Sequence, residues 1–199
     1  MQNSVNIVFL TSGKSRGSNF EVVMKHLSKL DLHIKVPFLI ITRDDAPIQY
    51  RAEKFGIECI LLKNRDTFEE DLLALLEEYD IDLIVLAGFM RKLSHSFLCE
   101  FSGKVINIHP ALLPKYGGKG MYGMRVHEKV FLKGDEESGV TVHYVNDDYD
   151  AGPIIAQRKI PIGHCSSAEE IAHEVLQIEH ILYPEVIEKL ARDFLQSHK

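Results

Sequence analysis

Short apolar runs alternate with segments of helical spacing along the first half of the chain. The first run is Val5 to Leu10, and four similar runs follow at residues 34–41, 57–62, 81–86 and 105–108. Continuous apolar runs of this length are typical of parallel strands that are buried on both faces. The alternation predicts an α/β fold that is Rossmann-like, with a mostly parallel twisted sheet flanked by helices on both faces. Ligands of such sheets bind beyond the carboxyl ends of the strands.

Helix starts are marked by a repeated spacing of polar side chains. Three pairs have the spacing of a capping box, namely Ser18 with Glu21, Thr67 with Glu70, and Ser167 with Glu170. The first pair comes directly after a glycine-containing loop, so this loop is expected to end on a helix N-terminus. The last pair begins a helix that Pro184 should kink or break, because proline lacks the amide hydrogen.

The second half of the chain begins with a long loop rich in proline and glycine. Its glycines are Gly117, Gly118, Gly120 and Gly123. A loop of about a dozen residues is long for a compact domain, and such loops are often functional. We expect a helix over residues 125–133 that stops at Gly134, then an alternating strand around residues 140–144 and another at residues 154–160. These strands form the antiparallel C-terminal part of the predicted sheet.

Composition places the chain among ordinary globular proteins, and its length of 199 residues fits one domain over residues 1–199. There are 23 basic and 29 acidic residues, which gives a net charge of −6 and makes nucleic acids and membranes unlikely partners. The most apolar stretch is far shorter than the roughly 20 residues that span a bilayer. Three widely spaced cysteines lack the pairing of a zinc or redox site, so we expect reduced thiols and a cytoplasmic location. A monomer and a homodimer both remain open.

Polar side chains interrupt the last run of the parallel sheet. Asn107 and His109 stand two apart, so they project from the same side of a strand that Pro110 ends. An asparagine amide in a buried strand must be paired, either by a structural partner or by a ligand, and the pattern favours neither. Asp147 and Asp150 belong to an acidic segment for which a solvated turn is the more common interpretation. The segment lacks the spacing of a calcium-binding loop.

The glycine-containing loop at residues 12–19 resembles a nucleotide-binding loop only in part. It contains Gly-Lys-Ser, but a triphosphate-binding loop needs a further glycine where Val8 stands. The three glycines of a dinucleotide fingerprint are also missing. A polar turn at a helix N-terminus remains, which suits a monophosphate or serves as a plain structural turn.

Four collinear motifs resemble the folate-dependent formyltransferases. The first two are Val-Ile-Asn-Ile-His-Pro-Ala-Leu-Leu-Pro at residues 105–114 and Asp-Ala-Gly-Pro-Ile-Ile at residues 150–155. The others are Leu-Ala-Gly-Phe-Met-Arg at residues 86–91 and Gly-Ser-Asn at residues 17–19. Together they span nearly the whole chain and resemble the branch of the family that formylates glycinamide ribonucleotide in purine synthesis.

This resemblance implies roles for particular residues. Asn107, His109 and Asp150 correspond to the catalytic trio of the family. The ribonucleotide-binding residues implied are Gly17, Ser18 and Asn19 at the phosphate and Glu179 at the ribose hydroxyls. The folate-binding residues implied are Arg91, Leu93, Leu98, Val145, Asn146 and Asp147. The co-substrate implied is 10-formyltetrahydrofolate, and no metal is required.

The family chemistry suits the three catalytic residues. Attack of an amine on a formyl group creates a negative oxygen, which Asn107 and a protonated His109 would stabilise as hydrogen-bond donors. Asp150 would favour the imidazolium and help to move the proton. Two departures are a phosphate loop lengthened by Lys14 to Arg16 and the glycine-rich segment 117–123, which we expect to be a mobile lid.

Three other functions compete with this interpretation. Formylation of an initiator tRNA would require an additional C-terminal domain and a basic surface, whereas this chain ends at residue 199 with a net charge of −6. A hydrolase that releases formate would carry an N-terminal regulatory domain, whereas the first strand starts at Val5. A non-catalytic nucleotide-binding module would have no use for the polar trio.

Overall fold

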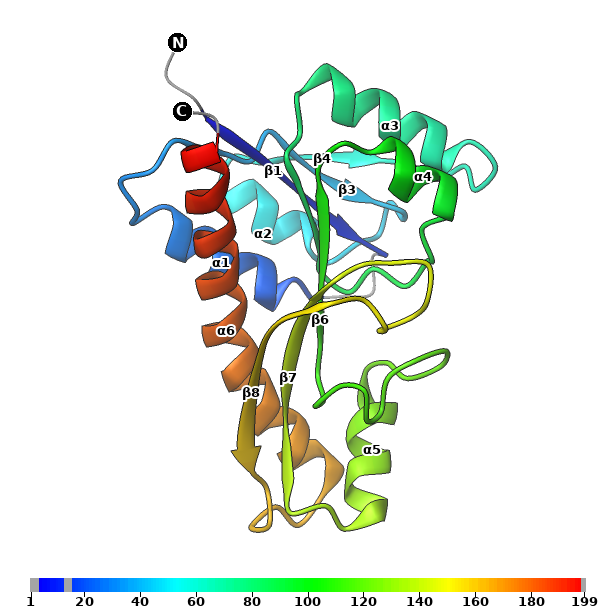
Figure 1. Ribbon diagram of the computed structural model, residues 1–199, viewed down its shortest axis with the longest axis vertical. Coiled ribbons are helices and arrows are strands. Elements are labelled where there is room, and N and C mark those ends of the chain that lie inside the picture. The colour runs from blue at the N-terminus through cyan, green and yellow to red at the C-terminus, as the bar shows by residue number, and fades with distance from the viewer. Residues whose placement is uncertain (1–3, 13–15, 198–199) are drawn as a thin grey trace. The chain divides into compact units, whose positions relative to one another are not determined.

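The computed structural model describes residues 4–12 and 16–197. Its strands are β1 (Val5–Thr11), β2 (Ile34–Lys35), β3 (Phe38–Ile41), β4 (Glu58–Leu61), β5 (Leu83–Leu86), β6 (Lys104–His109), β7 (Glu137–Tyr144) and β8 (Ile154–Pro161). Its helices are α1 (Ser18–Leu27), α2 (Gln49–Lys54), α3 (Phe68–Glu78), α4 (His95–Glu100), α5 (Met124–Lys133) and α6 (Ala168–Ser197) (Figure 1). The chain folds into two compact units, Met1–Ile106 with Ile187–Lys199, and Asn107–Val186.

The first unit is built on a parallel sheet in the strand order β4-β3-β1-β5. Strand β1 pairs in parallel with β3 on one side and β5 on the other, so that Phe9 lies opposite both Leu39 and Val85. Ile7, Val8, Phe9 and Leu10 are fully buried on consecutive positions, as expected of a strand covered on both faces. The predicted α/β fold is confirmed, and this sheet provides most of the core of the unit.

The apolar run 34–41 forms two strands rather than one. Pro37 separates β2 from β3, because proline has no amide hydrogen to donate to a neighbouring strand. Both short strands pair in parallel with β1, at Val5 and Asn6 for β2 and at Phe9 to Thr11 for β3. The expectation of a single strand here is therefore wrong, although the parallel pairing is retained.

The second unit begins in the middle of β6, whose neighbour in the sheet is β7. Strands β7 and β8 are antiparallel, with a register shift between Val142 and His143, and they lie side by side in Figure 1. The expected antiparallel C-terminal part is thus confirmed. Helix α5 ends as predicted at Gly134, which adopts the left-handed conformation that glycine tolerates at a helix C-terminus.

Capping differs from the expected pattern at two of the three helix starts. Helix α1 begins at Ser18, and its cap residue is Gly17 rather than Ser18. The Glu21 carboxylate instead binds Lys25 at 2.6 Å and also pairs with Arg51. At α3 the Thr67 side chain accepts no capping hydrogen bond. At α6 the Ser167 hydroxyl accepts from the backbone N–H of Glu170 at 3.2 Å, as predicted, whereas the Glu170 carboxylate accepts from the backbone N–H of Ser166.

Helix α6 continues through Pro184 without a break. Leu182, Tyr183, Val186 and Ile187 are buried on either side of the proline. Burial of this apolar face outweighs the loss of one backbone hydrogen bond, so of the kink or break expected at Pro184, the break does not occur. Within the described part of the chain, no helix is both long enough and apolar enough to cross a bilayer.

Candidate active site

Asn107, His109 and Asp150 come together in the second unit. Strand β6 supplies Asn107 and His109, and Asp150 lies in the loop between β7 and β8. The Nδ1 atom of His109 is 3.5 Å from Oδ2 of Asp150. On the other side of the ring, Nε2 of His109 is 2.8 Å from the backbone carbonyl of Tyr116. A carbonyl oxygen can only accept, so Nε2 carries a hydrogen and Nδ1 faces the carboxylate.

Asp150 is held by the loop that carries it and by the glycine-rich segment. Its φ is 56°, a left-handed conformation that few residues other than glycine adopt. Its Oδ2 atom accepts from the backbone N–H of Gly118 at 3.0 Å. Burial opposes ionisation of this carboxyl, but neighbouring groups, among them the Gly118 amide, outweigh it and lower the pKa of Asp150. Asp150 is therefore a carboxylate at neutral pH.

His143 is a member of this cluster that the sequence analysis missed. It lies on β7, and its Nδ1 donates to the carbonyl of Tyr144 at 2.8 Å, which leaves Nε2 as an acceptor in the neutral ring. Nε2 is 3.3 Å from the amide nitrogen of Asn107 and 3.7 Å from Oδ1 of Asp150. His143 thus holds one amide hydrogen of Asn107, and the other can donate elsewhere. The sequence signal that could have identified His143 was its position on the inward-facing side of the alternating strand β7.

Burial and the groups around the ring act in opposite directions on the pKa of His109. The side chain is almost fully buried, and this burial lowers the pKa of His109, with a further small effect from His143. Asp150 and the Tyr116 carbonyl act in the opposite direction without reversing the shift. The protonated His109 that the family roles implied stays a prediction. The ring faces two acceptors and is placed to take up a proton transiently.

A third buried histidine, His127, points from α5 into the interior of the second unit. Its side chain is 6% exposed, and its Nδ1 has no hydrogen-bond partner among the described residues. Burial, reinforced by repulsion from His109, lowers the pKa of His127 to about 4. His127 is consequently neutral across the physiological range.

The expected phosphate loop lies in the first unit. Gly17 has a φ of 75°, and a Cβ atom placed there would stand 2.5 Å from Cγ1 of Ile48, so only glycine fits. Ser18 and Asn19 form the first turn of α1, whose amide hydrogens point toward the start of the helix. Of the lengthened loop, Lys14 and Ser15 lie outside the described residues. A helix N-terminus of this kind attracts an anion.

Among the expected folate-binding residues, three belong to the first unit. The guanidinium of Arg91 lies 4.9 Å above the ring of Phe68. Its Nη1 atom is buried and has no hydrogen-bond partner among the described residues, and burial lowers the pKa of Arg91. Leu93 is buried in the core, and Leu98 on α4 is half-buried. A polar group of a ligand can accept the hydrogens on this Nη1 atom, which lack an acceptor among the described residues.

The remaining expected binding residues belong to the second unit. Val145, Asn146 and Asp147 follow β7, and the Asn146 side chain accepts from the backbone N–H of Asp148 at 3.2 Å. This contact shapes the turn that leads to Asp150. Glu179 lies on α6 with its side chain 9% exposed. A carboxylate so deeply buried requires polar partners.

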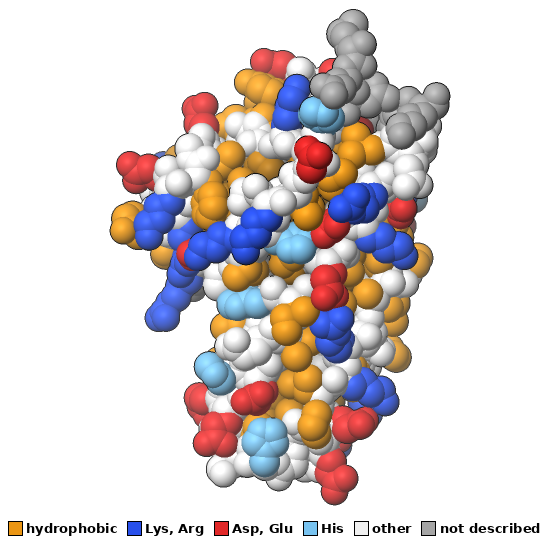
Figure 2. Space-filling model, turned by 90° about the vertical axis from the view of Figure 1, so that its left-hand side faces the viewer, with side chains coloured by type: hydrophobic (Ala, Val, Ile, Leu, Met, Phe, Trp, Pro, Cys, Tyr) orange, Lys and Arg blue, Asp and Glu red, His pale blue; other side chains and the backbone are white. Residues whose placement is uncertain are grey.

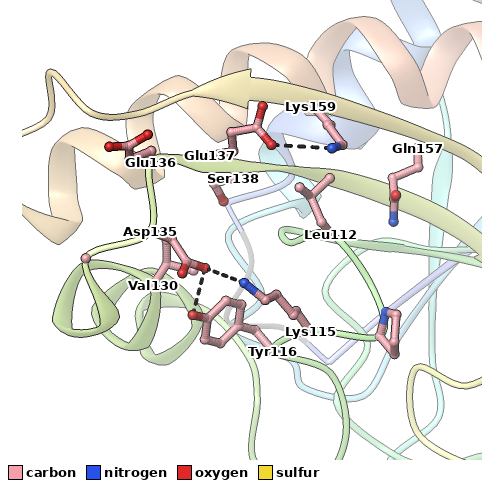
Figure 3. A pocket seen from close by; sticks show the side chains of 12 residues that line it. Leu112, Lys115, Tyr116, Val130, Asp135, Glu136, Glu137, Ser138, Gln157 and Lys159 are labelled. Carbon is pink, nitrogen blue, oxygen red and sulfur yellow. Dashed lines mark hydrogen bonds and ion pairs between the residues drawn. The ribbon is translucent and has the colours of Figure 1, made fainter.

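The glycine-rich segment begins beside the catalytic cluster. A Cβ atom at Gly117 would lie 3.2 Å from Cβ of Asp150, so the chain passes close to this residue. The adjoining Lys115 and Tyr116 line a separate cavity of about 660 Å³ that also includes Asp135 and Ser138 (Figure 3). A mobile lid over residues 117–123 stays a prediction.

Charged side chains of both signs are mixed over the face seen in Figure 2, in keeping with a net charge of −6. Within the described chain, no group of three or more His, Cys, Asp or Glu is arranged to hold a metal ion. A net charge of −6 repels anions, so an anionic ligand would have to be bound through local geometry.

The profile of the family described as formyl transferase matches residues 5–187. The chain belongs to this family. The formyl transferase family accounts for the collinear motifs, including the segment that carries Asn107 and His109 and the one that begins with Asp150.

Individual members of the family are similar to the chain over most of its length. It is 36% identical to the phosphoribosylglycinamide formyltransferase of Escherichia coli K12, over 98% of this chain and 91% of that protein. It is 38% identical to a chloroplastic enzyme of the same name from Vigna unguiculata, covering 94% of this chain but 60% of that longer protein. A solved phosphoribosylglycinamide formyltransferase from Coxiella burnetii has a TM-score of 0.84 and 39% identity, over 96% of this chain and 89% of that one.

Proposed function

We propose that this chain transfers the formyl group of 10-formyltetrahydrofolate to the amine of glycinamide ribonucleotide, in the synthesis of purines. The observation that carries the proposal is the cluster of Asn107, His109 and Asp150 in a member of the formyl transferase family. The similar proteins from Escherichia coli and Coxiella burnetii are phosphoribosylglycinamide formyltransferases. One formyltransferase domain over residues 1–199 is part of the proposal.

The cluster suits direct attack of the amine on the formyl carbon. A carbon–nitrogen bond forms, the carbonyl oxygen becomes negative, and a tetrahedral centre results. The amide hydrogen of Asn107 that His143 does not hold is available to stabilise this oxygen. One well-aligned donor of this kind contributes about 3–4 kcal/mol to the stability of the transition state. His143 therefore serves to orient the Asn107 amide.

Proton transfer completes the reaction. The attacking amine must lose a proton, and the folate nitrogen must gain one as the second carbon–nitrogen bond breaks. Neutral His109 can accept this proton on Nδ1, where the Asp150 carboxylate stabilises the resulting imidazolium. The same proton can then pass to the leaving nitrogen, directly or through water. The negative charge of Asp150 is therefore required for turnover.

The substrate-binding residues that we propose are those implied by the resemblance of the motifs, and local geometry supports them. The N-terminus of α1 at Gly17, Ser18 and Asn19 suits the phosphate of the ribonucleotide, and Glu179 suits its ribose hydroxyls. For the formyl folate, the orphaned guanidinium of Arg91 is a donor that requires a partner. The other folate residues proposed are Leu93, Leu98, Val145, Asn146 and Asp147.

We further infer that the protein acts in the cytoplasm, since Cys59, Cys99 and Cys165 are all free thiols. Its substrates are small molecules, with no nucleic acid or membrane as a partner, and a monomer or a homodimer would both support catalysis. These statements rest on composition and on the family.

The test of the proposed function is a direct assay. The protein is mixed with 10-formyltetrahydrofolate, and loss of the formyl-folate absorbance is followed with and without glycinamide ribonucleotide. We expect loss only when the amine is present, with one formylated product for each formyl group consumed. Loss that does not depend on the amine would indicate a hydrolase. Ligand binding without turnover would indicate a binding module, and either result would overturn the proposal.

A further inference from the structure

His109 is held between two residues with unusual backbone conformations. Among the described residues, three that are not glycine have a positive φ, and two of these are Tyr116 at 57° and Asp150 at 56°. Each of these two faces one nitrogen of the His109 ring. A bulky tyrosine rarely adopts this conformation, which is found at sites where the surrounding structure holds it in place. Something must therefore hold Tyr116 in this turn.

The side chain of Tyr116 supplies such an anchor. Its hydroxyl donates to Oδ2 of Asp135 at 2.9 Å, and the ammonium of Lys115 lies 3.2 Å from the same oxygen (Figure 3). Asp135 follows the end of α5, so the bond ties the turn to the end of a helix. A hydrogen bond to an ionised carboxylate is stronger than one between neutral groups.

The electrostatics of the pair agree with this geometry. The hydrogen bond from Tyr116, followed by the effects of Lys115, lowers the pKa of Asp135 against the effect of burial. Burial and Asp135 together raise the pKa of Tyr116 to about 12. The pair therefore keeps one form at neutral pH, a phenol that donates to a carboxylate.

We propose that Tyr116 and Asp135 are positioning residues for His109. The hydroxyl bond to Asp135 holds the turn at Tyr116, the turn presents the Tyr116 carbonyl to Nε2, and this carbonyl keeps the hydrogen on Nε2. Nδ1 is then left unprotonated and directed at Asp150, in the form needed to accept a proton from the attacking amine. The inference rests on the proposed catalytic role of His109.

Other groups also act on the titration of His109. Asp150 from the β7–β8 loop stabilises its charged form, whereas His143 from β7 opposes it. His127 from α5 would repel it if charged, but His127 is neutral above pH 5. The Tyr116 carbonyl stabilises the charged form, so loss of this contact should lower the pKa of His109 further.

The experiment compares wild-type protein with Tyr116→Phe and Asp135→Ala, using histidine labelled with ¹⁵N in the ring. Wild-type His109, assigned with a His109→Gln variant, should show the Nε2–H form. In both variants we expect mixed tautomers and a His109 pKa lower by about half a unit or more. The kcat should fall roughly tenfold through misalignment, with KM values within about threefold. The acid limb of the kcat profile should shift to lower pH.

Matched variants separate positioning from general damage. Lys115→Met removes the other partner of Asp135 but leaves the bond from Tyr116, so it should retain the wild-type tautomer and pH profile. Asp135→Asn keeps an acceptor for the Tyr116 hydroxyl in a weaker, neutral bond, so its effects should be smaller than those of Asp135→Ala. The double variant Tyr116→Phe with Asp135→Ala should be no worse than either single change. If Tyr116→Phe does not fold, Asp135→Ala decides alone.

Two negative results are distinguishable. An unchanged tautomer and pH profile in the folded Tyr116→Phe and Asp135→Ala proteins would overturn the positioning role, even if turnover fell. Full activity in His109→Gln would instead overturn the proposed catalytic role of His109, whatever the tautomer.

Discussion

Three histidines illustrate how burial governs chemistry at the scale of single residues. As whole residues, His109, His127 and His143 are 3%, 6% and 2% exposed. His143 satisfies both ring nitrogens, at the carbonyl of Tyr144 and the amide of Asn107. His109 faces two acceptors, whereas His127 has an orphaned Nδ1. The same residue type therefore orients a neighbour, accepts a proton or stays neutral, according to its partners.

The neutral state of His127 predicts how stability depends on pH. Its pKa of about 4 in the folded protein lies below the ordinary value of 6.5, so the unfolded chain binds more protons between these values. The stabilising effect is present above pH 6.5 and is lost as the pH falls toward 4. From 1.36 kcal/mol per pKa unit, the loss is about 3 kcal/mol.

This prediction is checked by measuring urea unfolding at several pH values for the wild type and for His127→Gln, which cannot titrate. The free energy of unfolding of the variant should fall about 3 kcal/mol less than that of the wild type between pH 7 and pH 4. Parallel curves for the two proteins would show that His127 is not held neutral by burial.

At the residue level, the sequence drew attention to positions where polar groups interrupt an apolar pattern. Asn107 and His109 stood out because a buried strand seldom carries them, and the structure brings them to Asp150. His143 was missed because a histidine in an alternating strand looks like an ordinary core residue. The Tyr116 carbonyl could not be predicted, since a backbone contact depends on the path of the chain rather than on residue type.

At the scale of elements, the loop before α1 shows how one glycine determines a helix start. Gly17 combines a positive φ with close contact to Ile48, and the helix begins at the next residue. The predicted capping box had the correct position but the wrong cap, because Glu21 is engaged by Lys25 and Arg51. Pro37 and Pro184 show that the effect of a proline also depends on its surroundings. Pro37 divides a run of apolar residues into two strands, whereas Pro184 does not interrupt its helix.

Replacement of Gly17 should disturb the expected phosphate site. Gly17→Ala introduces both left-handed strain and a clash with Ile48, which should displace the first turn of α1. We expect glycinamide ribonucleotide to bind at least tenfold more weakly, or about 1.4 kcal/mol, as measured by calorimetry. Its analogue without the phosphate should bind both proteins equally.

Gly56 provides the control for this change. Its φ is 67°, close to that of Gly17, but a Cβ atom there would meet nothing within 4 Å. Gly56→Ala should lower stability by about 1 kcal/mol through backbone strain alone and leave ribonucleotide affinity intact. If the Gly17→Ala and Gly56→Ala proteins bind glycinamide ribonucleotide with equal affinity, the proposed phosphate site at the start of α1 is wrong.

At the scale of the whole molecule, the fold class was predictable because its signal repeats along the chain. Five apolar runs separated by helical segments indicated the parallel sheet, an alternating run indicated β7, and a further run after Pro153 indicated β8. Function was predictable for a different reason, because the four collinear motifs matched a family. The net charge of −6 repels anionic substrates, so their capture has to rely on local donors.

The central claim of this account is that Asn107, His109 and Asp150 act as one unit in formyl transfer. The most direct measurement is the single-turnover rate at saturating formyl folate and glycinamide ribonucleotide, for Asp150→Asn, Asn107→Ala and the double variant. Asp150→Asn keeps the size of the side chain but removes its charge. Asp148→Asn, an exposed carboxylate in the same loop, is the matched control.

We predict that Asp150→Asn lowers the rate roughly 10²-fold to 10⁴-fold, the range for a lost acid–base group, while ligand affinities change only a few-fold. Asn107→Ala should cost about 10²-fold to 10³-fold, and the double variant should lose much less than the product of the two losses. Asp148→Asn should retain the wild-type rate. An Asp150→Asn protein that keeps more than about a tenth of the wild-type rate would contradict the account.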